Sequence, residues 1–155
     1  MANVTNGRNP TRRRLLLSGG AMLATLATVR HAAAQVDRSA GDEIAPPDLL
    51  EAMRAGDVTL IDIRRPDEWD KTGIADGAYP LDMRRADFVV ALSEITGGSL
   101  DRPVALICAR GVRSDRMSAR LAQAGFTRIV DVPEGMLGSA AGPGWLKRGL
   151  PVVRP

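Results

Sequence analysis

The apolar positions from Ile44 onward alternate between short β-prone runs and stretches with helical spacing. The run at 104–108 is apolar without a break and follows Pro103, a pattern typical of a strand buried on both faces. Shorter runs that predict strands lie at 59–63, 78–81 and 129–132. Because strands and helical stretches alternate, the pattern predicts a single α/β domain with a mostly parallel central sheet flanked by helices.

The helical stretches carry recognisable end signals. Pro46 suits the first turn of a short helix that Gly56 ends. A second helix is predicted over 86–95, where apolar side chains recur at helical spacing. In a third, Ser114 is the expected N-cap, and Gly125 is the expected left-handed residue after the last turn.

Two long loops are expected between these elements. Polar residues follow the first strand as far as Gly77, and a glycine-rich stretch covers 135–144. Trp145, directly after the second loop, is expected to pack in the core or to wall a pocket. The sequence has no internal repeat.

Residues 1–34 have the three zones of an export signal. A basic region is followed by an apolar zone at 15–29 and by an alanine cleavage site that ends at Ala34. The string at 11–17, TRRRLLL, resembles the twin-arginine signal of bacterial exported proteins. We therefore expect a cleavable export signal of this type and a periplasmic location.

The alternative for this segment is a membrane anchor. The apolar zone is about 15 residues long, and a membrane-spanning helix needs roughly 20. No stable anchor is therefore expected after cleavage. The mature chain would consist of a flexible linker at 35–43 and one folded domain at 44–155.

The charge distribution argues against a nucleic-acid partner. The chain has 21 basic and 18 acidic residues, and residues 1–34 hold five arginines and no acid. Beyond the leader, 16 basic residues therefore face 18 acidic ones, so the folded part is slightly acidic. A basic surface for nucleic acid is not expected there.

Histidine and cysteine are scarce, which narrows the possible chemistry. The chain has one histidine, His31, which lies in the predicted leader, and one cysteine, Cys108. Catalysis that pairs serine or cysteine with histidine is excluded in the mature chain, and so is a zinc site built from these residues. We expect no metal and no cofactor, and a reactive thiol in an oxidising compartment.

The residues that follow the strongest predicted strand form a candidate site for an anionic sulfur species. The segment 108–114 reads CARGVRS and runs from that strand into a predicted helix. Helix-dipole charge, inward-facing amides and the cations Arg110 and Arg113 would all favour a thiolate at Cys108. Gly111 would allow the loop to close tightly.

Each of these residues also has a structural interpretation. A free cysteine is often simply a buried core residue, although such a residue does not require the arginines and the glycine that follow Cys108. Arg113 could bind an anionic donor, or it could pair with an acidic residue beneath the loop. Both roles remain open for Arg113 from the sequence.

The chain resembles the rhodanese family over about residues 44–150. The family's active-site loop, C-x-x-G-x-R followed by Ser or Thr, matches Cys108, Gly111, Arg113 and Ser114. The upstream and downstream family patterns are matched by Asp62, Arg64, Glu68, Trp69, Gly73, Gly77, Ala78, Ser118, Ala119, Leu121, Gly125, Phe126 and Val130. The chain departs from the family where a Gly-Gly pair is common after the last strand, because Glu134 precedes Gly135 here.

The resemblance implies a rhodanese-like fold and sulfur transfer of the thiosulfate:cyanide type. Cys108 would take sulfur from thiosulfate or polysulfide, hold it as a persulfide and pass it to a thiol or cyanide-like acceptor. The rest of the loop would bind the substrate through its backbone amides and its two arginine side chains. These residues are Ala109, Arg110, Gly111, Val112, Arg113 and Ser114. Asp62 and Arg64 would support the loop.

Two other functions compete with this one. Cysteine phosphatases use C-x5-R, whereas Cys108 and Arg113 are spaced C-x4-R, which disfavours phosphatase activity. The second competitor is a rhodanese-like carrier or docking module, fed by a sulfur-relay protein and with little activity toward thiosulfate. Measured transfer from thiosulfate, compared with persulfide uptake from a partner, would separate these two.

Overall fold

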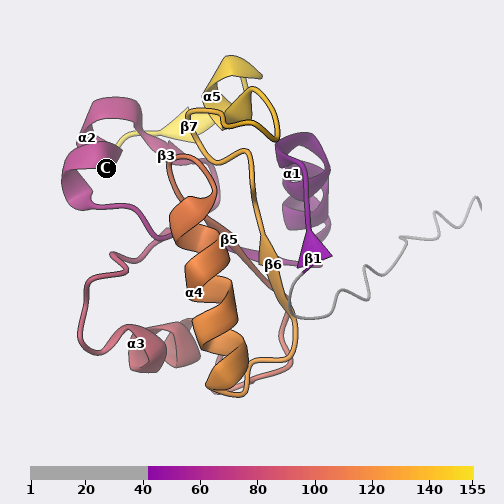
Figure 1. Ribbon diagram of the computed structural model, residues 1–155, viewed down its shortest axis with the longest axis vertical. Coiled ribbons are helices and arrows are strands. Elements are labelled where there is room, and N and C mark those ends of the chain that lie inside the picture. Colours follow the sequence, from indigo (N-terminus) through magenta and orange to yellow (C-terminus); the bar gives the residue numbers. More distant parts are fainter. Residues whose placement is uncertain (1–41) are drawn as a thin grey trace, which may run out of the picture. The chain divides into compact units, whose positions relative to one another are not determined.

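The computed structural model describes residues 42–155 (Figure 1). The export signal predicted over 1–34 and the linker residues 35–41 lie outside the described residues. Asp42–Glu43, which the sequence analysis assigned to the linker, instead forms strand β1, because it pairs in parallel with Ile129–Asp131 (β6). Among the described residues, no helix combines the length and the apolar character that crossing a bilayer requires.

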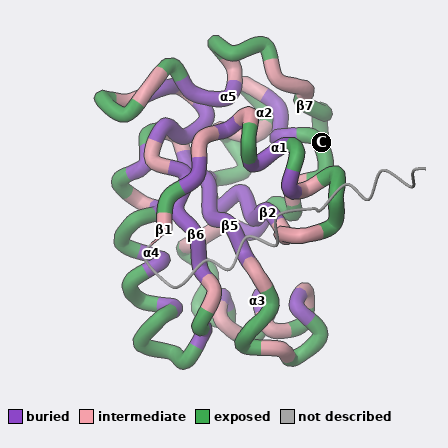
Figure 2. The backbone as a smooth tube through the Cα atoms, turned by 90° about the vertical axis from the view of Figure 1, so that its right-hand side faces the viewer, coloured by how far each residue is buried: buried purple, intermediate pink, exposed green. Residues whose placement is uncertain are grey.

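Five strands form a wholly parallel central sheet in the order β1-β6-β5-β2-β4. This confirms the predicted α/β domain. The strands between the two edges are the ones that the apolar runs predicted, and they are buried along most of their length (Figure 2). The remaining members of the sheet are Thr59–Asp62 (β2), Tyr79–Pro80 (β4) and Val104–Ile107 (β5).

The predicted polar loop after β2 is wrong in part. It contains a short helix, Pro66–Thr72 (α2), and a short strand, Ile74–Ala75 (β3). The helix has no buried residue, so no apolar periodicity marked it in the sequence. The strand pairs antiparallel with Val152–Val153 (β7), which lies near the end of the chain.

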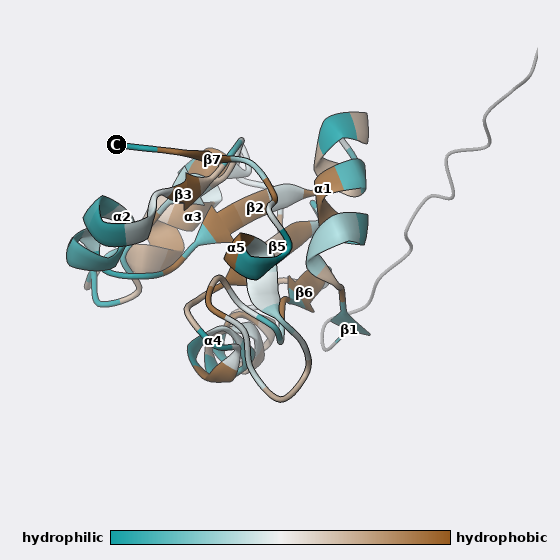
Figure 3. Ribbon diagram, turned by 90° about the horizontal axis from the view of Figure 1, so that it is seen from above, coloured by the Kyte–Doolittle hydropathy of each residue, from teal (hydrophilic) through white to brown (hydrophobic). Residues whose placement is uncertain are grey.

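Helices cover both faces of the sheet, as expected. Because side chains alternate along a strand, β5 places Leu106 on one face and Ile107 on the other. Phe88–Ile95 (α3) and Val112–Gln123 (α4) pack on the first face, and Pro46–Ala55 (α1) and Gly144–Lys147 (α5) on the second. The strands β2 and β5 are largely hydrophobic between these layers, whereas α2 is hydrophilic (Figure 3).

The predicted glycine-rich loop holds except at its last residue, Gly144, which begins the short helix α5. Trp145, in the same helix, is fully buried in the core against the second face of the sheet. Its indole Nε1 donates a hydrogen bond to the carbonyl of Pro151 at 2.9 Å. Trp145 is therefore a packing residue and does not line an open pocket.

Candidate active site

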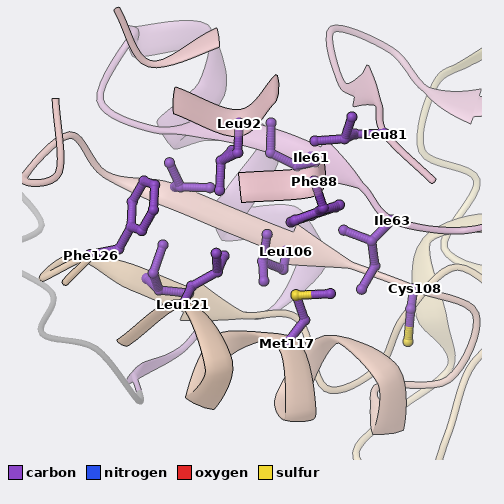
Figure 4. Packing of buried hydrophobic residues seen from close by; sticks show 12 residues of the cluster. Ile61, Ile63, Leu81, Phe88, Leu92, Leu106, Cys108, Met117, Leu121 and Phe126 are labelled. Carbon is purple, nitrogen blue, oxygen red and sulfur yellow. The ribbon is translucent and has the colours of Figure 1, made fainter. Parts of the chain in front are cut away.

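Cys108 lies at the carboxyl end of the central sheet, directly after β5. The strand was predicted to include this residue but ends at Ile107. The thiol is only 1% exposed and belongs to the core cluster that contains Leu106 and Met117 (Figure 4). Burial alone fits a core cysteine as well as a reactive one, so the surrounding loop must distinguish the two.

The loop presents a run of backbone amides that are free of protein acceptors. Within residues 42–155, none of the amides at 109–114 donates a hydrogen bond to a protein acceptor. The first of them follow Cys108 directly, and the last three belong to the first turn of α4. Amides in such a first turn have no partner within the helix, and they stabilise negative charge. The loop is therefore suited to an anion held next to the sulfur.

Gly111 gives the loop its sharp turn. Its φ is 85°, in the left-handed region, and a Cβ at this position would lie 2.3 Å from the carbonyl oxygen of Pro133. No side chain fits there. The prediction that Gly111 lets the loop close is consistent with both observations.

The predicted role of Ser114 as N-cap is wrong. The cap position is Gly111, and the helix begins three residues earlier than expected, at Val112. Ser114 is instead fully buried in the first turn, where its hydroxyl lies 2.8 Å from the carbonyl oxygen of Gly111 and 3.5 Å from the sulfur of Cys108. The helix therefore also includes Val112, Arg113 and Ser114, and the turn before it is made by Gly111 with its positive φ.

A second segment supports the loop from the side of β6. The amides of Met136 and Leu137 donate to the carbonyls of Cys108 and Ala109, each at 2.9 Å. Gly135 makes this approach possible, since a Cβ there would lie 2.6 Å from the backbone of Ala109. The start of the predicted glycine-rich loop is therefore docked along the cysteine loop.

Glu134 stands where the family commonly has a glycine, and it directly precedes the segment that supports the cysteine loop. Its carboxylate accepts hydrogen bonds from the amide of Gly144 at 2.9 Å and from Arg148 at 2.6 and 2.8 Å. The hydrogen bonds from Arg148 lower the pKa of Glu134 from its ordinary value. Gly142 lies against the same carboxylate, and a Cβ there would be 2.5 Å from it. The ion pair between Glu134 and Arg148 therefore connects the residue that precedes the glycine-rich loop with a residue that follows it.

Arg113 is held by an acidic residue, as one of its two predicted roles requires. Its guanidinium donates to both carboxylate oxygens of Glu68 in α2, at 2.6 and 2.8 Å. This ion pair raises the pKa of Arg113, and the charge of a Cys108 thiolate adds to that rise. Arg113 is therefore oriented by Glu68, and its positive charge lies close enough to act on the sulfur.

Arg110 differs from Arg113 in its surroundings. It is exposed, and its only hydrogen bond within the described chain goes to the carbonyl of Gly138, at 3.3 Å. No carboxylate among residues 42–155 lies within ion-pair distance of it. Its charge is therefore available to an anionic molecule that approaches the loop.

Asp62 and Arg64 form a buried ion pair at the end of β2, with a distance of 2.7 Å. The Arg64 guanidinium also donates to Thr72 Oγ1 and to the carbonyl of Gly73, both at 2.7 Å. These acceptors lie at the end of α2, the helix that carries Glu68. Within the described chain, the hydrogen bonds of this pair therefore reach α2 and not the cysteine loop, and the predicted loop support would act through Glu68 and Arg113.

The Glu68–Arg113 ion pair predicts a stability difference that depends on pH. The hydrogen bond from Arg113 lowers the pKa of Glu68 from 4.5 to about 2. Glu68→Gln should therefore lower the free energy of unfolding by about 1–2 kcal/mol at pH 7. Because the folded pKa is depressed, this difference is present above pH 4.5 and disappears as the pH falls toward 2.

Urea unfolding of both proteins from pH 7 to pH 2 measures the Glu68→Gln effect. Asp67→Asn is the matched control, because Asp67 pairs with Arg65 but is 49% exposed. We expect it to change the free energy of unfolding by less than about 0.5 kcal/mol. Equal losses in the two variants would show that the ion pair with Arg113 is no stronger than a surface pair.

The sequence analysis missed one charged residue of this site, Glu68, and the burial of a second carboxylate, Asp131. Glu68 was noted only as part of a family pattern, although Pro66 followed by Glu68 is a helix-start signal. The amide of Arg65 donates to the Glu68 carboxylate at 3.1 Å, as that signal implies. Asp131, which is 7% exposed at the end of β6, was read only as part of a strand.

Comparisons with family models, with characterised proteins and with solved structures give consistent results. The model of the rhodanese-like domain family matches residues 45–140. A sulfurtransferase from Allochromatium vinosum is 35% identical over 101 residues, which cover 64% of this chain and 81% of that protein. A thiosulfate sulfurtransferase from Pseudomonas syringae is 29% identical over 90 residues, 58% of this chain and 79% of that protein. The solution structure of a polysulfide-sulfur transferase homodimer from Wolinella succinogenes is similar with a TM-score of 0.58 at 26% identity, covering 74% of this chain and 79% of that one.

Proposed function

This chain belongs to the rhodanese-like domain family, and on that premise we propose that it is a sulfurtransferase that works through a persulfide on Cys108. The observation that carries the proposal is the position of the thiol, which directly precedes six amides without protein acceptors in the described chain. The named relatives act in sulfur transfer, which supports the same chemistry here. No residue of the site requires a metal or a cofactor for it.

The first half-reaction forms the persulfide. The Cys108 thiolate attacks the outer sulfur of thiosulfate, the sulfur–sulfur bond of thiosulfate breaks, and sulfite leaves with the electron pair. The charge of the terminal sulfur is then stabilised by the loop amides and by Arg113, which Glu68 holds in place. Arg110 attracts the doubly negative donor, because no carboxylate of the described chain pairs with it.

The second half-reaction returns the enzyme to its starting state. A nucleophilic acceptor such as cyanide attacks the terminal sulfur, the sulfur–sulfur bond of the persulfide breaks, and the thiolate of Cys108 is released. Thiocyanate is the product. The two half-reactions balance without an oxidant or a reductant, and the covalent intermediate divides one transfer into two simpler steps.

Steady-state kinetics test this proposal. Thiocyanate formation is measured with thiosulfate or polysulfide as the donor and cyanide as the acceptor. A persulfide intermediate predicts parallel lines in double-reciprocal plots, because the donor product leaves before the acceptor binds. No thiocyanate from either donor would overturn the enzyme proposal. If the protein takes up sulfur only from the persulfide of a partner protein, it is instead a rhodanese-like sulfur carrier with little activity toward thiosulfate.

We also propose that the protein is exported through the twin-arginine pathway and acts in the periplasm. The support is the string at 11–17 and the alanine site that ends at Ala34. In the producing bacterium, Arg12→Lys together with Arg13→Lys should remove the protein from the periplasmic fraction, because the pathway reads the arginine pair and not its charge.

Immunoblots of periplasmic and cytoplasmic fractions measure the export defect. Arg8→Lys, which changes an arginine outside the string, is the matched control and should be exported normally. Periplasmic protein at the wild-type level in the Arg12/Arg13 variant would exclude the twin-arginine route.

A further inference from the structure

Asp131 lies on the same face of the sheet as Cys108. In the register of β5 and β6, Asp131 pairs with Leu106, two residues before the cysteine. Ile129 packs in the core cluster that contains Leu106 and Cys108. Because residues two apart in a strand share a face, the Asp131 side chain also points toward that side, which α4 covers.

The carboxylate of Asp131 is buried and incompletely hydrogen-bonded. The residue is 7% exposed, and its Oδ1 has no hydrogen-bond partner within the described chain. The elements packed against β6 face it with Ser114 and Asp115 from α4 and with Glu43 from β1, whereas β5 has no charged residue. Burial raises the pKa of Asp131 to about 6, and the two neighbouring carboxylates raise it as well, against a hydrogen bond with Ser114 that lowers it.

Ser114 connects this carboxylate to the sulfur. Its hydroxyl is fully buried and lies 2.8 Å from the Gly111 carbonyl oxygen and 3.5 Å from the Cys108 sulfur. Its interaction with the Asp131 carboxylate lowers the pKa of that group. A hydroxyl has one proton to donate. The sulfur therefore competes for that proton with the Gly111 carbonyl and with a carboxylate whose own protonation can change.

We propose that Asp131 is a positioning residue that acts on Cys108 through Ser114 and reduces the thiolate when it is ionised. As a carboxylate, it attracts the Ser114 proton and places a negative charge near the sulfur, which opposes a thiolate. As a carboxylic acid, it donates to Ser114 Oγ, and the serine proton becomes available to the sulfur. The proposal rests on the proposed function only in taking Cys108 as the nucleophile.

The sign of the pH effect follows from the direction of the Asp131 shift. Because its folded pKa is raised to about 6, the residue is neutral at lower pH and ionised at neutral pH. Asp131 therefore reduces the thiolate form of Cys108 above pH 6. Between pH 6 and 8, the alkylation rate of the wild-type protein should therefore rise less steeply than the ionisation of a single thiol predicts. This expectation can be checked on the wild-type protein alone.

The alkylation rate of Cys108 with iodoacetamide between pH 4.5 and 9 measures the effect of Asp131 on the thiolate, and it requires no sulfur donor. Asp131→Asn keeps the shape and a donor toward Ser114 but cannot ionise. We expect its alkylation rate constant to be about three to ten times that of wild type at pH 7.5, and equal to it below pH 5. A variant profile that coincides with wild type, together with a wild-type profile described by one ionisation, would overturn the proposal.

Two further variants separate the path through Ser114 from a general effect of charge. Asp115→Asn removes an exposed carboxylate one residue after Ser114 and should change the rate constant less than about twofold. In a Ser114→Ala background, Asp131→Asn should also change it less than about twofold. An Asp115→Asn effect as large as that of Asp131→Asn, or a full Asp131→Asn effect without Ser114, contradicts the proposed path.

This experiment and the sulfur-transfer assay can fail independently. A protein that transfers no sulfur but shows the Asp131 effect on alkylation would reject the proposed enzyme and retain this inference. A protein that transfers sulfur with an alkylation profile unaffected by Asp131→Asn would do the reverse.

Discussion

Replacing Cys108 by serine is expected to reduce thiocyanate formation about a thousandfold or more, to the rate of the reaction without enzyme. The chain has a single cysteine, so no other thiol can carry the sulfur. Serine has nearly the same shape, and its oxygen does not form the persulfide. The folded loop should persist, because its turn depends on Gly111 and on the amides of Met136 and Leu137.

The loss must be distinguished from unfolding. The urea midpoint of Cys108→Ser should stay close to that of wild type, since a serine fits the space of the cysteine. Ser118→Ala is a useful control, because Ser118 is buried in α4 and, within the described chain, its hydroxyl donates only to the carbonyl of Ser114, at 2.9 Å. It should keep most of the activity. A Cys108→Ser protein with a tenth or more of the wild-type rate would show that the transfer does not pass through this thiol.

Gly111→Ala should have the largest effect among substitutions that leave the chemical groups intact. Its Cβ would lie 2.3 Å from the Pro133 carbonyl oxygen, and the residue has a φ of 85°. Overpacking against backbone costs about 1–3 kcal/mol and the left-handed conformation another 1–2 kcal/mol. We expect the free energy of unfolding to fall by about 3 kcal/mol and sulfur transfer to fall about a hundredfold, because the loop amides move.

Gly98→Ala separates the two causes. Gly98 has a φ of 81°, but a Cβ there would meet nothing within 4 Å. This variant should therefore lose only about 1–2 kcal/mol by urea unfolding and should transfer sulfur at the wild-type rate. If Gly111→Ala and Gly98→Ala behaved alike in both measurements, the close approach of the cysteine loop to Pro133 would have no functional importance.

The sequence predicted the elements that bury apolar side chains. Strands β2, β5 and β6 and helices α1, α3 and α4 all appear where apolar runs or helical spacing indicated them. Helix α2 was missed because it buries no residue. The β3–β7 pair was missed because its two strands, at 74–75 and 152–153, are brought together only by the folded chain.

The same distinction explains what the sequence could say about the site. The residues Cys108, Gly111 and Arg113 lie in one short loop, so their spacing alone identified it. Glu68 is 45 positions from Arg113, and the sequence could indicate only that some acid pairs with the arginine. The place of Asp131 beneath α4 depends on the register of β5 and β6, which a single sequence does not show.

Intact mass spectrometry of the purified protein tests the central claim most directly. The protein is incubated with thiosulfate or with polysulfide, and cyanide is then added. We predict that wild type gains the mass of one sulfur atom, that Cys108→Ser gains none, and that cyanide removes the sulfur as thiocyanate. No mass gain with either donor, in a protein whose Cys108 is still readily alkylated, would contradict a sulfur relay through this residue.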